Sequence, residues 1–529
     1  MGRSFDEQIV SNGSPGASLG LARPGTNGRG EPPLLEPGPT SHKKRRGTKL
    51  ISAEDVLGGN LGPELAVDLD TRYGNADLIR AMRLLGMAGP FRPVSPWELE
   101  DQDGHRRIDA SGYSALPFGA GSPQLTEFLG QYLQHNQDVP LPLQSASRWR
   151  AALAHNLIRL LQEFAPSHAD SEVHFSTSGS EAVENAIKFV RAGRPRARYL
   201  VNFQNAYHGH TLMALSLTPN HAYQDLFRPM APDVVTLPFG ELRPLERAVE
   251  GLGPENVAAV VLEPIQGEGG VIIPPDGYLR AVGELCRRYG ILVVADEVQT
   301  GLGRTGHYFE SLAQGLEPDI LVLGKHLSGG MAPIGVTIAR RRLCRIAVGG
   351  TGCDRLAGTY SGNSLSVAVA LKSLDLLVEQ DLPARAQALG KRGLQRLQQI
   401  QARYPGLVEQ VRGAGVLFAL QLKPVLASGL LGSQAEAVGE LTSLLALSVL
   451  HQAGVHANMA MNARRVVRLS PALTIPEDLF DKMWDRVEQA ADSSSPAWRL
   501  AAHSHLRTLL GLSGLALATH RQGLAPPGP

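Results

Sequence analysis

The sequence has little cysteine, few aromatic residues and almost no excess of either charge. Its 529 residues include 3 Cys, 5% aromatic residues, and 51 Lys and Arg against 50 Asp and Glu, for a formal net charge of +1. Three scattered cysteines are too few for a disulfide framework or for a zinc site built from several cysteines, and they indicate reduced thiols in a cytoplasmic protein. The balanced charge gives no reason to expect a nucleic acid or an acidic surface as partner.

Long apolar runs are also missing. No segment approaches the ~20 apolar residues of a membrane-spanning helix, and the N-terminal segment, with Asp6 and Glu7, lacks the apolar core of a secretory signal. We therefore expect a cytoplasmic protein without a membrane partner. No metal site is expected either, because His208 and His210 stand two apart, as ligands on a strand would, but have no third partner in view.

Lysine is scarce in the middle of the chain, and its position there is informative. Lys325 is the only lysine between Lys188 and Lys372. It follows the apolar run 320–323 and stands in the glycine-rich stretch 324–330. A lysine after a single strand is usually a solvated surface residue, so this position by itself is weak evidence for catalysis.

Two earlier apolar runs also end on an ionisable residue: residues 257–262 precede Glu263, and residues 291–295 precede Asp296. Short apolar runs separated by helix-length segments predict buried parallel strands of an α/β sheet, where ligands bind beyond the carboxyl ends. Asp296 taken alone is equally typical of a helix N-cap. Together with Lys325, however, these acids suit a Schiff-base enzyme that uses pyridoxal 5'-phosphate.

A candidate phosphate site lies upstream. A predicted strand at 173–175 is followed by the small residues of 176–181 and by a helical pattern at 182–191. Exposed N–H groups at such a helix start attract an anion, but the Ser-x-x-Glu pattern is also that of a capping box, and both interpretations stay open. The next predicted strand, 198–203, leads to Tyr207, whose ring would stack on a flat cofactor or pack in the core.

Taken together, these motifs resemble the class III aminotransferases of the ornithine, acetylornithine and ω-amino acid type. The resemblance covers residues 73–475 and implies fold type I: a large domain built on a mostly parallel α/β sheet, with a smaller α+β domain from the N- and C-terminal segments. The motifs occur in the family's order and are Ser178-Gly179-Ser180-Glu181-Ala182, Tyr207-His208-Gly209, Glu263-Pro264-Ile265-Gln266-Gly267-Glu268, residues 296–306, Leu323-Gly324-Lys325, Thr359-Tyr360-Ser361-Gly362-Asn363 and Val467-Arg468-Leu469-Ser470-Pro471.

The resemblance implies pyridoxal 5'-phosphate as cofactor and a role for each residue around it. Lys325 would form the Schiff base and shuttle the proton, and Asp296 would keep the pyridine nitrogen protonated. Family members build each site at a dimer interface, so a homodimer with shared active sites is expected. The other cofactor contacts would be Gly179 and Ser180 at the phosphate with Ser178 beside them, Tyr207 and Val298 on the two ring faces, His208, Gln299 at the phenolic oxygen, and Thr359 of the neighbouring subunit.

The resemblance also implies an amino-group transfer from an ω-amine donor (a diamine, ornithine-like compound or ω-amino acid) to a 2-oxo acid, with 2-oxoglutarate as the expected acceptor. Glu263, Glu268 and Arg468 would line the substrate pocket, with Arg468 clamping a carboxylate that Glu268 replaces when the donor has none. His210 stands where many ornithine-type members have Arg, which removes a fixed positive charge. The alternatives are an aminomutase, decarboxylase or racemase on the same scaffold and, from another class, an idle binding or regulatory protein.

Composition and periodicity divide the chain into five parts. Residues 1–48 are rich in Gly, Pro and Ser and are expected to lack a fixed structure. Residues 49–117 would begin the small domain, 118–378 would form the large cofactor-binding domain, 379–492 would complete the small domain, and 493–529 would be a tail with helical character. The predicted helices are at 76–87, 123–134, 147–164, 182–191, 364–380 and 477–491, and the predicted strands include 97–99, 107–109, 408–413 and 416–421.

Overall fold

The computed structural model describes residues 50–112, 115–426, 435–502 and 511. The chain divides into two units, Met1–Asn60 and Leu61–Pro529. The described part of the first unit contains the short helix α1 (Ala53–Leu57), which Ser52 and Asp55 close with a capping box. The second unit contains the sheets and the site. The predicted disorder of residues 1–48 and most of the predicted tail helix lie outside the described residues.

The largest sheet has seven strands in the order β4-β10-β9-β8-β7-β5-β6. All neighbouring pairs are parallel except the two that involve β10, so the predicted, mostly parallel α/β sheet is confirmed. The sequence did not predict β6 or the antiparallel β10. The strands are β4 (Glu172–Ser176), β5 (Tyr199–Phe203), β6 (Val234–Leu237), β7 (Val257–Leu262), β8 (Leu292–Asp296), β9 (Ile320–Leu323) and β10 (Gly335–Ala339).

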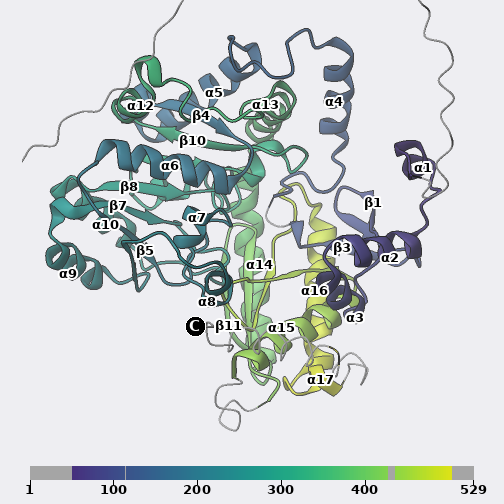
Figure 1. Ribbon diagram of the computed structural model, residues 1–529. Coiled ribbons are helices and arrows are strands. Elements are labelled where there is room, and N and C mark those ends of the chain that lie inside the picture. The colour runs from purple at the N-terminus through teal and green to yellow at the C-terminus, as the bar shows by residue number, and fades with distance from the viewer. Residues whose placement is uncertain (1–49, 113–114, 427–434, 503–510, 512–529) are drawn as a thin grey trace, which may run out of the picture. The chain divides into compact units, whose positions relative to one another are not determined.

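Helices cover both faces of this sheet (Figure 1). On one face, α6 (Gly179–Gly193) and α12 (Arg341–Val348) share an apolar core with the central strands. On the other face, α9 (Leu242–Leu252) and α10 (Tyr278–Tyr289) bury a second apolar cluster against β5, β7 and β8. Every residue of β7 is buried, as the continuous apolar run of a central parallel strand requires.

Two smaller sheets join distant parts of the chain. In the first, β1 (Arg92–Ser95), β2 (Glu98–Glu100) and β3 (Arg106–Asp109) are antiparallel, and β13 (Val455–His456) pairs parallel with β3. The second contains the predicted antiparallel pair, seen as β11 (Val408–Ala414) and β12 (Leu417–Leu422), together with β14 (Asn458–Met459) and β15 (Val466–Leu469). The first of these sheets combines N- and C-terminal segments, but the exact domain limits stay predictions.

The predicted helices are present, with shifts at their ends. The helix predicted at 76–87 is α3 (Ala76–Leu84), which ends early because Gly86 takes a φ of +76°. The remaining described helices are α2 (Pro63–Tyr73), α4 (Pro123–His135), α5 (Arg148–Phe164), α7 (Leu212–Ser216), α8 (His221–Gln224), α11 (Glu310–Ala313), α13 (Ser364–Glu379), α14 (Leu382–Arg403), α15 (Ala435–Gln452), α16 (Glu477–Ser494) and α17 (Arg499–Ala502).

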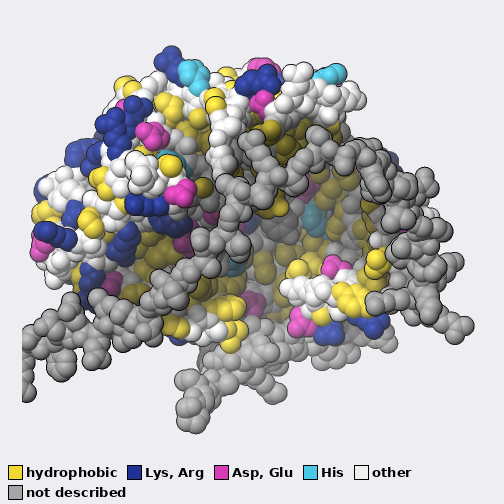
Figure 2. All heavy atoms as spheres, turned by 45° about the horizontal axis from the view of Figure 1, so that its top comes forward, with side chains coloured by type: hydrophobic (Ala, Val, Ile, Leu, Met, Phe, Trp, Pro, Cys, Tyr) yellow, Lys and Arg dark blue, Asp and Glu magenta, His cyan; other side chains and the backbone are white. Residues whose placement is uncertain are grey.

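The surface agrees with the balanced composition. Figure 2 shows basic and acidic side chains interspersed on the face that it draws, with no large area of one sign. Among the helices of the described residues, none combines the length and the apolar character that a membrane span needs.

Candidate active site

Three strand ends meet where the sequence predicts them to meet. Glu263 follows β7, Asp296 ends β8, and Lys325 begins a short 3-10 helix (Lys325–Ser328) just after β9. All three line one cavity of about 200 Å³. The other residues around this cavity are Gly179, Ser180, Tyr207, His208, Gly209, Val298 and Gln299.

Lys325 sits in an unusual backbone conformation. Its φ is +39°, in the left-handed region that side-chain-bearing residues seldom adopt and that is often found at functional sites. Burial lowers the pKa of Lys325, and the negative charges of Glu268 and Asp296 act in the opposite direction. A lowered pKa increases the fraction of neutral amine, which is the nucleophilic form.

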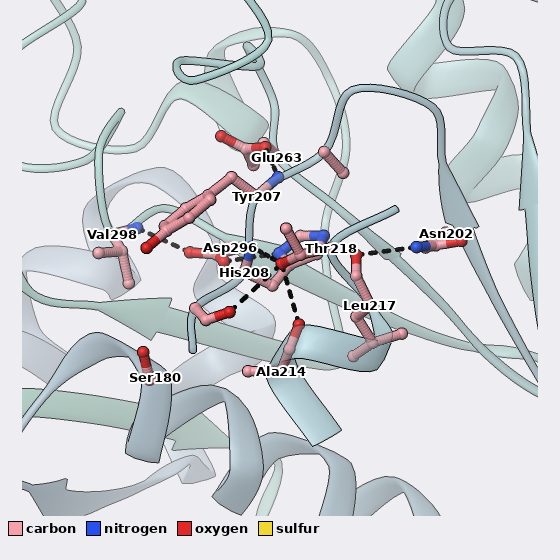
Figure 3. Close-up of polar contacts among 12 residues, drawn as sticks. Ser180, Asn202, Tyr207, His208, Ala214, Leu217, Thr218, Glu263, Asp296 and Val298 are labelled. Atoms are coloured by element: carbon pink, nitrogen blue, oxygen red, sulfur yellow. Dashed lines mark hydrogen bonds and ion pairs between the residues drawn. The ribbon is translucent and has the colours of Figure 1, made fainter. Parts of the chain in front are cut away.

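The Asp296 carboxylate is buried and held on both oxygens. Oδ2 lies 2.7 Å from Nδ1 of His208, and Oδ1 accepts the N–H of Val298 at 3.1 Å. Burial acts to lower the pKa of His208, but the hydrogen bond and the charge of Asp296 outweigh it and raise the pKa. His208 is held in turn, because its backbone N–H donates to Oγ1 of Thr218 at 2.9 Å (Figure 3). The pair therefore presents a fixed carboxylate to the cavity.

Glu263 organises the backbone beside the cavity. Its carboxylate accepts the N–H groups of Tyr207 at 2.9 Å and of Gly267 at 3.1 Å. Burial raises the pKa of Glu263 to about 7. Burial also raises the pKa of the Tyr207 phenol to about 12, so this ring is neutral at physiological pH. In Figure 3 the Tyr207 ring extends from the Glu263 side toward Val298, across the cavity wall.

The Ser-Gly-Ser-Glu segment at the start of α6 has features of both a helix cap and an anion-binding site. Oγ of Ser178 accepts the N–H of Glu181 at 3.2 Å, as an N-cap does. The Glu181 carboxylate accepts the N–H and the hydroxyl of Thr177, each at 2.7 Å, and not the N–H of Ser178 that a capping box would use. The N–H groups of Gly179 and Ser180, in the first turn of the helix, have no hydrogen-bond partner among the described residues, which leaves them for an anion.

Two glycines let the walls of the cavity approach one another. A Cβ on Gly209, whose φ is +128°, would lie 2.2 Å from Oγ of Ser180, and a Cβ on Gly179 would lie 2.9 Å from Cγ1 of Val298. Free helix N–H groups, a buried carboxylate, an aromatic wall and an amine with a lowered pKa therefore surround one space. This arrangement fits pyridoxal phosphate.

A buried ion pair lies near this cavity. Nη1 of Arg468, on β15, is 2.8 Å from Oε1 of Glu268, and the two side chains are 4% and 7% exposed. The other oxygen of Glu268 accepts the N–H of Met461 at 3.1 Å. Neither charged residue is among those that line the cavity of about 200 Å³, but both charges act on the pKa of Lys325.

Of the remaining predicted residues, some line a cavity and others lie on the surface. Gln299 lines the cavity, and its side chain covers Gly267. Ser178 lines an adjoining cavity of about 350 Å³, which Lys325 also borders. Thr359 is exposed and lines neither cavity. His210 is also exposed, with its ring edge-on to that of Tyr207 at 5.5 Å between centroids.

Sequence reasoning missed two supporting residues. Nothing in the sequence marks Thr218, because its role depends on the fold bringing it to His208. Glu297 carried a signal, since an acid directly after Asp296 at a strand end is unusual in a buried position. Its carboxylate accepts hydrogen bonds from Thr300, Glu310 and Ser311 and so fixes the loop after β8.

The fold and the site define a pyridoxal-phosphate-dependent transferase of fold type I. The model of the "Aminotransferase class-III" family matches residues 97–491, so the chain belongs to the class III aminotransferases. These enzymes use pyridoxal phosphate.

Individual relatives agree with this assignment. The chain is 34% identical to "Aminotransferase PigE" of Serratia sp. (strain ATCC 39006) over 401 residues, 73% of this chain and 44% of that protein, so it spans less than half of the relative's length. A PLP-bound amine transaminase from an uncultivated Pseudomonas species is 28% identical, with a TM-score of 0.67 over 76% of this chain and 94% of its own. The ornithine aminotransferase of Toxoplasma gondii ME49 is 25% identical, with a TM-score of 0.70 over 84% and 98%.

Proposed function

We propose that this aminotransferase moves an amino group from an ω-amine donor, such as a diamine, an ornithine-like compound or an ω-amino acid, to a 2-oxo acid, with 2-oxoglutarate as the acceptor. The observation that carries this proposal is the buried pair of Arg468 and Glu268 within electrostatic reach of Lys325. Because Glu268 supplies a carboxylate to Arg468, the site can accept a donor that has no carboxylate of its own. The similarity to an ornithine aminotransferase and an amine transaminase supports the same substrate class.

Bound pyridoxal phosphate supplies an electron sink for the carbon that carries the substrate amine. The N–H groups of Gly179 and Ser180 would hold its phosphate, Tyr207 and Val298 would contact the two faces of its ring, and Gln299 would bind its phenolic oxygen. Asp296 would keep a proton on the ring nitrogen, because the His208 contact holds its carboxylate in place. Lys325 Nζ, as a neutral amine, would take the proton from the substrate carbon and pass it on to the cofactor.

The ion pair of Glu268 and Arg468 would take a different arrangement in each of the two half-reactions. With a terminal-amine donor, Glu268 stays on Arg468, so that the buried cation is never left unpaired. With 2-oxoglutarate, the acceptor's carboxylate takes that place and Glu268 moves aside. The contact of Glu268 with the Met461 N–H gives the carboxylate one hydrogen bond that does not depend on Arg468.

Single-turnover kinetics of the two half-reactions test this proposal. Glu268→Ala should slow the half-reaction with a terminal-amine donor more than the half-reaction with 2-oxoglutarate, and should admit glutamate-like donors. Arg468→Ala should weaken acceptor capture most, by roughly 2–5 kcal/mol, because it leaves a buried carboxylate unpaired.

The matched control is Glu409→Ala, which removes the partner of Arg465 from a more exposed Arg–Glu pair and should change neither half-reaction. If Glu268→Ala slowed both half-reactions equally, Glu268 would only line the pocket and would not exchange places with the acceptor's carboxylate. A screen of diamines, ω-amino acids and ornithine-like donors then fixes the donor. Product formation without an acceptor would point to an isomerase, racemase or decarboxylase instead.

We also propose a homodimer in which Thr359 serves the phosphate site of the neighbouring subunit. Thr359 is exposed and stands in a surface region with large exposed apolar side chains, as expected of a contact face. The hydroxyl of Ser364 donates to the carbonyl of Val139, so the segments around 140 and 360 form one continuous surface. The exposed fractions there are 56% for Val139, 41% for Leu141, 41% for Leu143, 62% for Tyr360 and 40% for Leu365.

A cytoplasmic location is proposed as well. Cys286, Cys344 and Cys353 are all free thiols, and two of them are buried. Free thiols are the normal state in a reducing compartment. Fractionation of the producing cell with a fused reporter tests the location.

A further inference from the structure

A group of metal-ligating side chains lies away from the active-site cavity, on the edge strand of the large sheet. Glu172 and His174 are on β4, and Cys344 is on α12, one turn into the helix that follows β10. One ligand atom from each of the three residues lies within 4.8 Å of the other two. Strand and helix meet here because β10 pairs with β4 and α12 packs against α6 (Figure 1).

The donor set is selective. A thiolate, an imidazole and a carboxylate suit zinc and related transition metals, whereas magnesium and calcium prefer oxygen ligands alone. Around a tetrahedral zinc ion, with bonds of about 2.0–2.3 Å, donor atoms stand roughly 3.5 Å apart. The three atoms therefore need to approach one another by about 1.3 Å at most, and the Glu172 side chain, 40% exposed at the rim, has the freedom to do so.

His174 gives independent evidence for a missing partner. Its Nε2 is buried and forms no hydrogen bond within the part of the chain that the structure describes. Buried polar atoms nearly always have a partner, so this nitrogen is an exception that calls for one. The ring is held against that of Phe189, with 4.8 Å between centroids, and so is already ordered for binding.

The present partners of the cluster are weak enough to be replaced. Glu172 pairs with Nε of Arg341 at 3.3 Å, but that arginine side chain is 45% exposed, and exposed pairs contribute little. Arg341 keeps another acceptor in the carbonyl of Asp170. Sγ of Cys344 has a long contact of 3.6 Å to the carbonyl of Ala339, and it also interacts with the side chain of Glu172, the other candidate ligand.

We propose that Glu172, His174 and Cys344 form a binding site for a zinc-type divalent ion, with solvent as the fourth ligand, that fastens α12 to β4. On binding, a metal–sulfur bond forms and the thiol proton of Cys344 leaves to solvent. β4 runs directly into the Ser176–Ser178 loop and the start of α6. The ion therefore braces the strand that positions the phosphate site, and its binding stabilises the folded chain.

The test uses the full chain saturated with pyridoxal phosphate, stripped of metal with a chelator and dialysed, and then titrated with zinc. We expect about one zinc per chain after gel filtration and a rise in Tm with zinc concentration. Both should disappear in His174→Gln and Cys344→Ala. Two controls should keep both effects: Cys286→Ala, which removes a buried cysteine on α10, and His105→Gln, which changes the exposed histidine of the Asp101-Asp103-His105 cluster.

Zinc-edge X-ray absorption of the unaltered protein gives a readout that does not depend on variants. One sulfur neighbour at about 2.3 Å supports the site. A zinc ion surrounded by nitrogen and oxygen alone, no zinc retained at micromolar concentrations, or equal retention by all variants would each overturn the proposal.

Discussion

Single side chains set the chemistry of the site through their burial. Lys325 has a lowered pKa because the site is buried, and the charges of Glu268 and Asp296 limit the effect. Glu263 has a raised pKa for the same reason, although two backbone N–H groups bind it. Desolvation thus favours the neutral amine on Lys325 and the neutral acid on Glu263. His208 is the exception, because a carboxylate at 2.7 Å outweighs its burial.

Replacing Lys325 tests the covalent role directly. Lys325→Ala should keep cofactor in the cavity through the phosphate and ring contacts but should remove the amine that binds it covalently. Sodium borohydride should then fix no cofactor to the protein, as measured by mass spectrometry, and turnover should fall by several orders of magnitude. Lys372→Ala, at the next lysine in the sequence, is the control. Turnover at the unaltered rate in Lys325→Ala would reject the assignment.

Glu263 makes a prediction about pH. Its folded-state pKa of about 7 lies above the ordinary 4.5, so the unfolded chain releases this proton at a lower pH than the folded chain does. The contribution of Glu263 to stability is therefore complete below pH 4.5 and is lost as pH rises to about 7, by up to about 3 kcal/mol.

Glu263→Gln cannot titrate, so the free energy of unfolding of the parent relative to this variant should fall across that interval, as measured by urea denaturation. Glu284→Gln, at an exposed position on α10, should follow the parent at every pH. Parallel curves for the parent and Glu263→Gln would contradict the prediction.

At the scale of elements, the site depends on how closely loops approach the start of α6. Ser178 caps the helix, while Gly179 and Ser180 keep their N–H groups available. The loop after β5 comes so near that only glycine is accommodated at 209, in a conformation with φ of +128°. The helix start and this turn form one cradle, although 30 residues separate Ser180 from His210, whose N–H binds the Ser180 hydroxyl.

Gly209→Ala should open this cradle. Its new Cβ would lie 2.2 Å from Oγ of Ser180, so the turn or the helix start must shift. We expect cofactor affinity to fall at least tenfold, measured by equilibrium titration of the apoprotein with pyridoxal phosphate. Gly130→Ala on α4, where a Cβ meets nothing within 4 Å, is the matched control and should leave the affinity unchanged. Unchanged affinity in Gly209→Ala would show that the close approach is unimportant.

At the scale of the molecule, the site is assembled from strand ends of the large sheet and from β15 of a smaller one. Arg468 reaches Glu268 because the small sheet packs against the loop that follows β7, with Ile265 and Val466 in one apolar cluster. The exposed position of Thr359 and the apolar side chains near it fit a second copy of the chain completing the phosphate site, as proposed above.

Subunit mixing tests this shared site. If Thr359 serves the other subunit, a heterodimer of Lys325→Ala and Thr359→Ala chains has one site with both defects and one with neither. Activity should then reappear after exchange, up to about a quarter of the parent value when half of the dimers are mixed. A mixture of two Lys325→Ala preparations is the control. No recovery, with exchange demonstrated by differently tagged chains, would place Thr359 in its own subunit's site.

The sequence by itself determined the strand ends and the glycine-rich turns, and it predicted which residues are reactive. Apolar runs that end on Glu263, Asp296 and Lys325 are local patterns, and burial of each run follows from its composition. The motifs and their order along the chain were enough to indicate the class III aminotransferase family. The helix cap at Ser178 was also readable, since capping acts over three residues.

Only the tertiary structure decided the contacts between residues far apart in sequence. The pairs His208–Asp296 and Glu268–Arg468, the support from Thr218, and the meeting of His174 with Cys344 all depend on packing between elements. The antiparallel pairing of β10 with β4 and the parallel pairing of β3 with β13 also join strands that are far apart in sequence. Strand direction and side-chain proximity depend on which surfaces bury each other, and no local pattern contains that information.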